Sequence, residues 1–383
     1  MSNSILLAPG PVQLHPEVQK ILALPMIHHR TSEFDIILKS TLGNLKFIFQ
    51  TTQPVFMQTS TGSGGMECLL VNVMSKNDKI LSLISGKFGE RWADMAEAFG
   101  GQVIRYQIPW GQSANLTEVE KILNQNPDIK IVLSQACETS TGTKHPIQEL
   151  ATLIKKTDAL FLVDAITALG AYHLPMDLWG LDGLVGGSQK AFMLPTGMSF
   201  LSFSEKAWLK IKTANVSKFY FNIENEYAAN LKGETLFSSN VMIIRALDYI
   251  LKNILMAGTE SGLKNLFRTI ERRSIYTHEI ARALNLKLYS ENPSPSVTAI
   301  ELPSNIDGVQ FRSQLENKYN VVVMGGQDSL KGKVIRIGHM GYITDEDLHQ
   351  TTLQLAKCLN DFKQNINLEI IQNKSKDLLT DKV

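Results

Sequence analysis

Short apolar runs alternate with stretches of helical periodicity between about residue 54 and residue 204. This alternation is typical of successive βα units, which build a mainly parallel sheet. We expect strands at seven runs: Val55–Met57, Lys79–Ile84, Gln102–Tyr106, Ile129–Ser134, Ala159–Val163, Gly183–Val185 and Met198–Phe203. The link between the last two contains Pro195 and Gly197 and is too short for a helical crossover, so the final strand is expected to run antiparallel to its predecessor.

The pattern changes after residue 204. Residues 207–213 have helical spacing, residues 218–239 have the composition of a long irregular loop, and residues 241–257 and 262–284 again have helical periodicity. Strands and helices alternate once more from Val297 to Phe362, as in a compact α/β unit. We therefore predict an α/β fold with this organisation: an N-terminal arm at 1–20, a large domain at 21–260, a smaller C-terminal α/β domain at 261–372 and a disordered polar tail at 373–383.

Charge and cysteine content narrow the function. The chain has 38 Lys and Arg against 37 Asp and Glu, so no charge excess points to nucleic acid or an anionic membrane. Its three cysteines, Cys68, Cys137 and Cys358, lie far apart and suggest neither a disulfide framework nor a metal site. The N-terminus resembles no secretion signal, and no apolar stretch is long enough to cross a bilayer. These features favour a cytoplasmic protein that acts on small molecules.

Asp164 and Lys190 are the strongest candidates for catalysis. Asp164 directly follows one apolar strand, and Lys190 follows another a few residues later. In a parallel sheet the carboxyl ends of the strands form one functional edge. A lysine amine can form a Schiff base with an aldehyde, and an aspartate can keep a pyridine nitrogen protonated, so the pair suits pyridoxal phosphate. Taken singly, such an aspartate is more often a helix cap and such a lysine a solvated charge.

Other segments add contacts that this cofactor needs. The run from Thr59 to Gly65 follows a strand and opens a helix, which is the arrangement of a phosphate-binding loop, although plain tight turns share it. Phe88 also follows a strand and could stack on a ring, or it could be a core aromatic. Gln189 could form a hydrogen bond with a phosphate. Ser140 lies in a polar run that follows another strand, where polar residues can form hydrogen bonds with a ring oxygen.

Arg336 lies in the apolar strand run Val334–Gly338, where a charged side chain needs a partner. A guanidinium there suits a substrate carboxylate, and an exposed edge-strand arginine is the equally plausible alternative. The run His28, His29 and Arg30 is ambiguous, and nothing in it has the spacing of a metal site.

Together these segments resemble the class V branch of fold-type I pyridoxal-phosphate enzymes, specifically the alanine–glyoxylate and serine–pyruvate aminotransferase group. The resemblance covers nearly the whole chain and rests on the joint order of these motifs: Ala8–Pro11, Gly62–Glu67, Phe88–Arg91, Glu138–Gly142, Val163–Asp164, Gly187–Lys190 and Arg336–Gly338. It implies a large domain with a mainly parallel seven-stranded sheet, a smaller C-terminal domain and a homodimer whose subunits share their active sites.

The resemblance also implies roles for single residues. Lys190 corresponds to the Schiff-base lysine, which also carries the proton, and Asp164 to the partner of the pyridine nitrogen. Arg336 corresponds to the clamp on the substrate α-carboxylate, and Phe88 stands where the family commonly has Trp. The remaining implied contacts are these: Thr61, Gly62, Ser63 and Gln189 to the phosphate, Ser140 to the cofactor ring, and Ser238 and Ser239 near a loop that reaches the partner's phosphate.

The implied reaction moves an amino group from a small L-amino acid, with alanine or serine preferred, to a 2-oxo acid such as glyoxylate or pyruvate. Aspartate, phosphoserine and 2-aminoethylphosphonate remain alternative donors. Cysteine desulfurases share the fold, but the family pattern has His where this chain has Gln189 and Phe88. Some similar sequences carry the label of a soluble hydrogenase subunit, for which the scattered cysteines offer no cluster of metal ligands.

Overall fold

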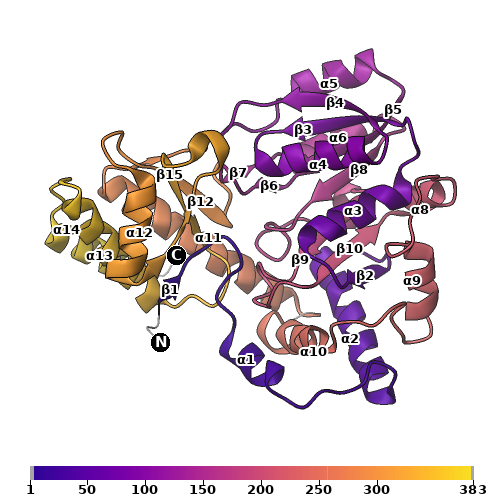
Figure 1. Ribbon diagram of the computed structural model, residues 1–383, viewed down its shortest axis with the longest axis horizontal. Coiled ribbons are helices and arrows are strands. Elements are labelled where there is room, and N and C mark those ends of the chain that lie inside the picture. Colours follow the sequence, from indigo (N-terminus) through magenta and orange to yellow (C-terminus); the bar gives the residue numbers. More distant parts are fainter. Residues whose placement is uncertain (1–3, 257, 381–383) are drawn as a thin grey trace.

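The computed structural model describes residues 4–256 and 258–380, and these form two sheet-centred bodies. Figure 1 shows the larger body, built from the first two thirds of the chain, and the smaller one, built from the C-terminal third. The chain passes between them through one long helix, α11 (Glu260–Ala283). Leu263 and Ile270 of this helix are part of the large core, and Tyr276 and Ile280 are part of the small one. We propose that the domain boundary lies near residue 260, where α11 begins.

The larger body contains the predicted seven-stranded sheet, in the order β2-β10-β9-β8-β5-β3-β4. Its strands are β2 (Val55–Gln58), β3 (Lys79–Ile84), β4 (Gln102–Gln107), β5 (Ile129–Gln135), β8 (Leu160–Asp164), β9 (Gly183–Gly187) and β10 (Ser199–Phe203). β10 runs antiparallel to both neighbours, and the other pairs are parallel. The α/β fold and the reversed last strand are therefore confirmed.

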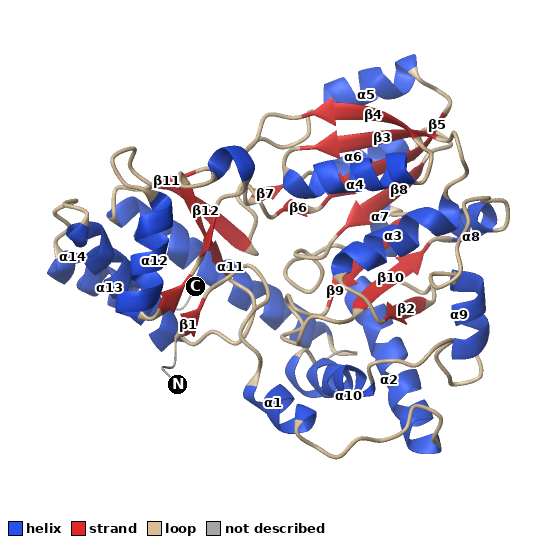
Figure 2. Cartoon of the chain, viewed as in Figure 1, coloured by secondary structure: helices blue, strands red, loops and turns tan. Residues whose placement is uncertain are grey.

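Helices cover both faces of this sheet, as the red strands between blue helices in Figure 2 show. One face packs against α3 (Gly62–Val73), α4 (Lys87–Ala98) and α8 (Glu205–Ile211) around Trp92 and Phe56. The other face packs against α2 (Ser32–Phe49), α5 (Leu116–Gln125), α6 (Ile147–Ile154) and α10 (Val241–Tyr249). Because both faces of the sheet are covered, its inner strands are mostly apolar, whereas the edge strand β4 is partly exposed and contains Arg105.

Two segments around the sheet differ from the expected pattern. The stretch 218–239, expected to be an irregular loop, contains α9 (Ile223–Asn230), which begins at the N-cap Asn222. The buried face of α9 consists only of Ile223 and Glu226, which is too short to produce a helical pattern of apolar residues in the sequence. Within the helix expected over 241–257, the described residues form α10 and then a short π-helical turn, Ile250–Ile254, and residue 257 lies outside the described residues. Three short elements complete this body: α1 (Pro16–Leu22), α7 (Met176–Trp179) and the hairpin of β6 (Cys137–Glu138) and β7 (Thr143–Lys144).

The smaller body has an antiparallel sheet in the order β11-β12-β15-β14. Its elements are β11 (Lys287–Leu288), β12 (Val297–Glu301), α12 (Gly308–Tyr319), β13 (Val321–Val322), β14 (Met324–Gly325), the 3-10 turn Asp328–Leu330, β15 (Val334–Gly338), α13 (Asp345–Asp361) and α14 (Leu368–Thr380). The N-terminal segment joins it, because β1 (Ile5–Leu6) pairs in parallel with β13 and Leu7 enters its core.

The expectation of a disordered tail from Asn373 is corrected by α14. Ile371 and Ser375 are buried, and the Ser375 hydroxyl lies 2.5 Å from that of Tyr276 on α11. The helix is polar overall, so its composition resembled a solvated tail, and only its contact with α11 and α13 holds it in place. Residues 381–383 of the predicted tail and residues 1–3 of the predicted arm lie outside the described residues.

Candidate active site

A cavity of about 280 Å³ opens at the carboxyl ends of the neighbouring parallel strands β8 and β9. Seven of the residues predicted from the sequence line it: Thr61, Gly62, Ser63, Phe88, Asp164, Gln189 and Lys190. Five further lining residues were not predicted: Met66, Arg91, Thr139, Ile166 and Thr167. The topology therefore brings side chains from five separate strand ends, those of β2, β3, β5, β8 and β9, to one place, as expected for the edge of a parallel sheet.

Lys190 is held inside this cavity by the N-terminal segment. Only 9% of the residue is exposed, and Nζ donates a hydrogen bond to the Pro9 carbonyl at 2.9 Å. Gly10 passes so close that a Cβ atom there would lie 2.3 Å from the lysine Nζ, which explains a glycine at this position. Burial lowers the pKa of Lys190 to about 8, while the carboxylate of Asp164 opposes this shift. The amine is thus partly neutral near physiological pH, as a nucleophile or base must be.

Asp164 ends β8 and is 5% exposed. Its Oδ1 accepts the backbone N–H of Ile166 at 2.9 Å. Burial raises the pKa of Asp164 to about 7, the nearby Glu138 adds to this, and Lys190 and Arg91 oppose it. A protonated ring nitrogen beside this carboxyl would favour its ionised form, so the residue fits the role of partner to a pyridinium.

The first turn of α3 has the features of an anion site. Its N-cap, Thr61, makes no side-chain capping bond, and the turn contains no acidic residue. The first N–H groups of the helix therefore face the cavity without an internal partner, and the helix dipole adds positive potential. The Oε1 atom of Gln189 is buried and lacks a hydrogen-bond partner among the described residues. The N–H donors at the start of α3 fit the phosphate of pyridoxal phosphate, and the Gln189 oxygen can accept a hydrogen bond from a donor in the cavity.

Phe88 is positioned by a buried carboxylate that the sequence did not single out. Oε2 of Glu138 accepts the backbone N–H groups of Phe88 and Gly89, each at 3.0 Å. Oε1 accepts the N–H and the hydroxyl of Ser140, at 3.0 and 2.6 Å. Burial raises the pKa of Glu138, and all four donors oppose that shift. This carboxylate thus caps α4, the helix whose N-terminal part carries Phe88 and Arg91.

Ser140 does not line the cavity. Its hydroxyl donates to Glu138 and accepts the Lys87 N–H at 3.1 Å, so its contacts are with the protein. The neighbouring Thr139 lines the cavity instead, with its hydroxyl 2.8 Å from that of Thr167. Glu138 is the first residue of the polar run that the sequence indicated, but no role was assigned to it, because its partners lie on a helix about fifty residues away.

Arg336 is buried on β15 next to the cavity rather than in its lining. Its Nε donates to the Gly325 carbonyl and its Nη1 to the Thr139 carbonyl, each at 2.9 Å. Among the ion pairs of the described residues none involves Arg336, so two backbone carbonyls orient its guanidinium, and Glu138 acts on its charge only from a distance. This excludes the alternative of an exposed edge arginine, and it fits a carboxylate ligand.

The remaining candidates lie farther out. Ser239 Oγ is 3.5 Å from Thr59 Oγ1, beside the phosphate-type loop, and Ser238 is exposed. His28 and His29 stack at 4.4 Å on the surface between α1 and α2, and Arg30 pairs with Glu234. Across the described residues, no group of His, Cys, Asp and Glu has the arrangement of a metal site.

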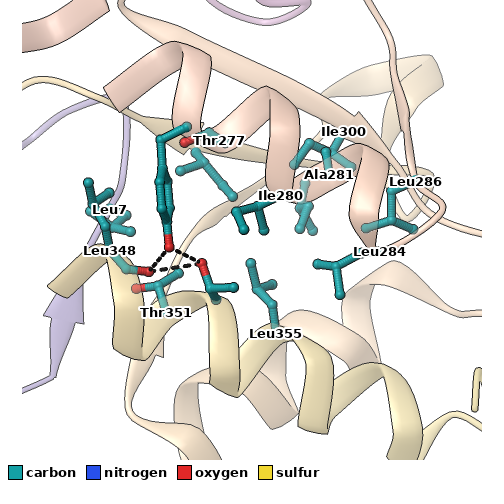
Figure 3. A pocket seen from close by; sticks show the side chains of 14 residues that line it. Leu7, Thr277, Ile280, Ala281, Leu284, Leu286, Ile300, Leu348, Thr351 and Leu355 are labelled. Carbon is teal, nitrogen blue, oxygen red and sulfur yellow. Dashed lines mark hydrogen bonds between the residues drawn. The ribbon is translucent and has the colours of Figure 1, made fainter. Parts of the chain in front are cut away.

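A second cavity, shown in Figure 3, lies inside the smaller body between α11 and α13. It has a volume of about 20 Å³ and is walled by aliphatic side chains such as Ile280, Leu284 and Leu355. This space is the size of one water molecule. Among the described residues that line it, Tyr276 is the only ionisable one.

The family model described as "Aminotransferase class-V" matches residues 14–350. An uncharacterized aminotransferase of Methanocaldococcus jannaschii is 36% identical over 91% of each chain. The soluble hydrogenase 42 kDa subunit of Anabaena cylindrica is 36% identical over 90% of each chain. The L-aspartate–glyoxylate aminotransferase of Paracoccus denitrificans is 33% identical over 90% of this chain and 88% of its own.

Two solved structures are also similar. The ureidoglycine–glyoxylate aminotransferase of Bacillus subtilis matches with a TM-score of 0.92 and 25% identity over 99% of this chain and 98% of its own. The alanine–glyoxylate aminotransferase of Nostoc sp. matches with a TM-score of 0.88 and 28% identity, over 94% and 96% of the two chains. The described helices include none long and apolar enough to span a membrane.

Proposed function

We propose a specific reaction for this chain on the premise that it belongs to the class-V aminotransferase family. As a transaminase it transfers amino groups between an amino acid and a 2-oxo acid. We propose pyridoxal phosphate as its cofactor. The observation that carries this proposal is one cavity in which a buried lysine of lowered pKa, a buried aspartate and an uncapped helix start face the same space.

When bound, pyridoxal phosphate supplies an aldehyde carbon that takes up the amino group and a ring that stabilises negative charge at the substrate α-carbon. Lys190 Nζ then removes and returns the α-proton, which its lowered pKa permits near neutral pH. Asp164 holds the ring nitrogen protonated, and Phe88 packs against the ring. The residues at the start of α3 and Gln189 hold the phosphate.

Arg336 binds the α-carboxylate of both amino and oxo substrates in this proposal. Its two bonds to backbone carbonyls fix the guanidinium plane before substrate arrives, which lowers the entropy lost on binding. With the carboxylate bound at Arg336 and the α-carbon at Lys190, the substrate's small side chain occupies what is left of the cavity. A space of about 280 Å³ that must also accept the cofactor ring favours a small side chain.

We propose glyoxylate or pyruvate as the acceptor and alanine or serine as the donor. Support for glyoxylate comes from three similar proteins that are named as glyoxylate aminotransferases. Their names give aspartate, ureidoglycine and alanine as the other substrate. Aspartate is the strongest competing donor, because the Paracoccus denitrificans relative is named for it. A panel of amino donors with glyoxylate, scored by the oxo acid formed, distinguishes these candidates. Sulfide released from cysteine without oxo-acid exchange would instead support a desulfurase.

We further propose a homodimer in a reducing, cytoplasmic setting. Exposed aromatic residues gather on the segment that follows α8: Phe219 is 83% exposed, and Tyr220 stacks on Phe237 at 5.1 Å. This segment leads to Ser238 and Ser239 and touches the phosphate-type loop through Tyr220 and Thr59. A second subunit that covered it would place these serines near a shared site. The three cysteines are buried and unpaired, which suits a reducing compartment.

Replacement of the lysine tests the core of the proposal. Lys190→Ala is expected to abolish turnover and to prevent covalent retention of pyridoxal phosphate after borohydride reduction, as measured by protein mass. Lys252→Ala, which removes an exposed lysine on the surface of the larger body, serves as the matched control and is expected to retain both. Retained turnover or a retained covalent adduct in the Lys190 variant would disprove the assignment.

A further inference from the structure

The N-terminal part of α4 presents a second cation to the cavity besides Lys190. Arg91 lines the cavity three residues after Phe88, on the same side of the helix. Its Nη1 donates to the Ser63 hydroxyl at 3.0 Å, and its guanidinium carbon lies 4.9 Å from the centre of the Phe88 ring. Two contacts from different elements thus hold this exposed side chain at the cavity rim.

The charge of Arg91 is not neutralised by its neighbours on the helix. The carboxylate directly before it, Glu90, pairs with Lys87 at 3.3 Å. The carboxylate one turn later, Asp94, pairs with Arg105 at 2.5 Å. None of the ion pairs among the described residues involves Arg91. Both acidic side chains within its reach along α4 are therefore engaged elsewhere.

Arg91 is aimed at a region that is already positive. Ser63, its hydrogen-bond partner, lies in the first turn of α3, where the helix start lacks both a side-chain cap and an acidic residue. A guanidinium and the positive end of a helix repel one another unless an anion lies between them. Their convergence is therefore the arrangement of a binding site for an oxyanion with several oxygen atoms.

We propose that Arg91 is a further ligand of the phosphate group of the cofactor, opposite the start of α3. This inference rests on the proposed function and extends its list of phosphate contacts to a helix from a different βα unit. The same guanidinium contacts the Phe88 ring, so phosphate binding through Arg91 also helps to fix the ring that packs against the cofactor. A second carboxylate on a substrate such as aspartate has similar chemistry and is the competing ligand.

The test compares cofactor forms with and without the phosphate. Cofactor-free wild type, Arg91→Gln and Arg91→Lys are titrated by isothermal calorimetry with pyridoxal 5′-phosphate, pyridoxal and inorganic phosphate. Arg91→Gln is expected to weaken binding of pyridoxal 5′-phosphate and of inorganic phosphate by about 5- to 30-fold, as for loss of one charge-assisted hydrogen bond, and to leave pyridoxal unchanged. Arg91→Lys is expected to recover part of the lost affinity, because lysine keeps the positive charge but lacks the two parallel N–H donors of a guanidinium.

Arg282→Gln is the matched control, since it removes an exposed arginine that is paired with Glu279 on α11, outside the cavity. It is expected to bind all three compounds like the wild type. Equal binding of pyridoxal 5′-phosphate by Arg91→Gln and wild type would overturn the proposal. A rise in KM for aspartate but not alanine, with unchanged cofactor affinity, would assign Arg91 to a substrate carboxylate instead. If the wild type itself binds no pyridoxal 5′-phosphate, the proposed function fails, whereas an unaffected Arg91→Gln leaves it standing.

Discussion

Glu138 is expected to hold the active-site end of α4, and Glu138→Gln tests this. The wild-type carboxylate accepts four hydrogen bonds while fully buried, two from the α4 start at Phe88 and Gly89 and two from Ser140. Glutamine has nearly the same shape but only one acceptor oxygen. The substitution therefore removes a charge and half of the acceptor capacity without creating a cavity.

The cost follows from these contacts. If the amide oxygen keeps the bonds from Phe88 and Gly89, the amide nitrogen faces Ser140. The Ser140 hydroxyl can rotate to accept from that nitrogen, but the Ser140 N–H is left without a partner, at a cost of about 1–3 kcal/mol. The two remaining bonds change from charged to neutral acceptors and each weakens by about 1 kcal/mol. The lower desolvation cost of a neutral amide offsets part of this. We expect the free energy of unfolding to fall by about 2–4 kcal/mol.

Urea unfolding of the cofactor-free protein measures the loss, and calorimetry with pyridoxal 5′-phosphate measures the effect on the site. We expect weaker cofactor binding as well, because α4 carries Phe88 and Arg91 into the cavity. Asp182→Asn is the matched control. Asp182 is a buried carboxylate that accepts hydrogen bonds from the Phe161 N–H and the Ser204 hydroxyl. It lies directly before β9, at the end of the sheet opposite to the cavity.

The control is expected to lower the free energy of unfolding without changing cofactor affinity. A Glu138→Gln protein as stable as the wild type would refute the reasoning about the four donors. Lower stability with unchanged cofactor affinity would show that Glu138 supports the fold without positioning the site.

Two further predictions concern the charged groups of the site. Arg336→Lys is expected to raise KM for amino donors by about 10- to 100-fold with little change in cofactor affinity, since a lysine cannot hold the planar bidentate geometry; an unchanged KM in steady-state assays would contradict this role. In the cofactor-free protein, Asp164 has its pKa raised from 3.8 to about 7, so the folded state binds the extra proton between these values and Asp164 makes the protein less stable as pH rises through them. Lys190 has its pKa lowered from 10.5 to about 8, so the unfolded state binds the extra proton between these values and stability rises again above about 8. Urea unfolding across pH should therefore show a minimum between these transitions that Asp164→Asn with Lys190→Met removes, and a minimum that persists in the double variant would disprove this origin.

The large sheet and much of the cavity lining were predictable from the amino-acid sequence. All seven expected strands are present, because the strands inside the sheet are buried and mostly apolar and are bounded by polar or glycine-rich turns, while the partly exposed edge strand β4 keeps an apolar centre. The positions of Asp164 and Lys190 followed from the same rule, since the side chain after a parallel strand emerges at the functional edge of the sheet. Such features depend on residues that are adjacent along the chain.

The polar network around the cavity could not be predicted in the same way. Glu138 acquires its role from N–H groups at Phe88 and Gly89, which belong to another βα unit. Pro9 contacts Lys190 only because β1 pairs with β13 in the smaller body and draws the N-terminal segment across the cavity. Likewise, α14 is stable as a packed helix through its contact with Tyr276, although its composition resembles a solvated tail.

Periodicity along the chain reports which side chains are buried and where strands end, and from this came the fold class, the lysine, the aspartate and the phosphate-type loop. Periodicity contains no information on which buried polar groups meet, because hydrogen bonds form between atoms that approach only when the βα units have packed. The cap of Glu138 on α4, the two carbonyls that orient Arg336 and the contact of Arg91 with Ser63 were therefore decided by the tertiary structure.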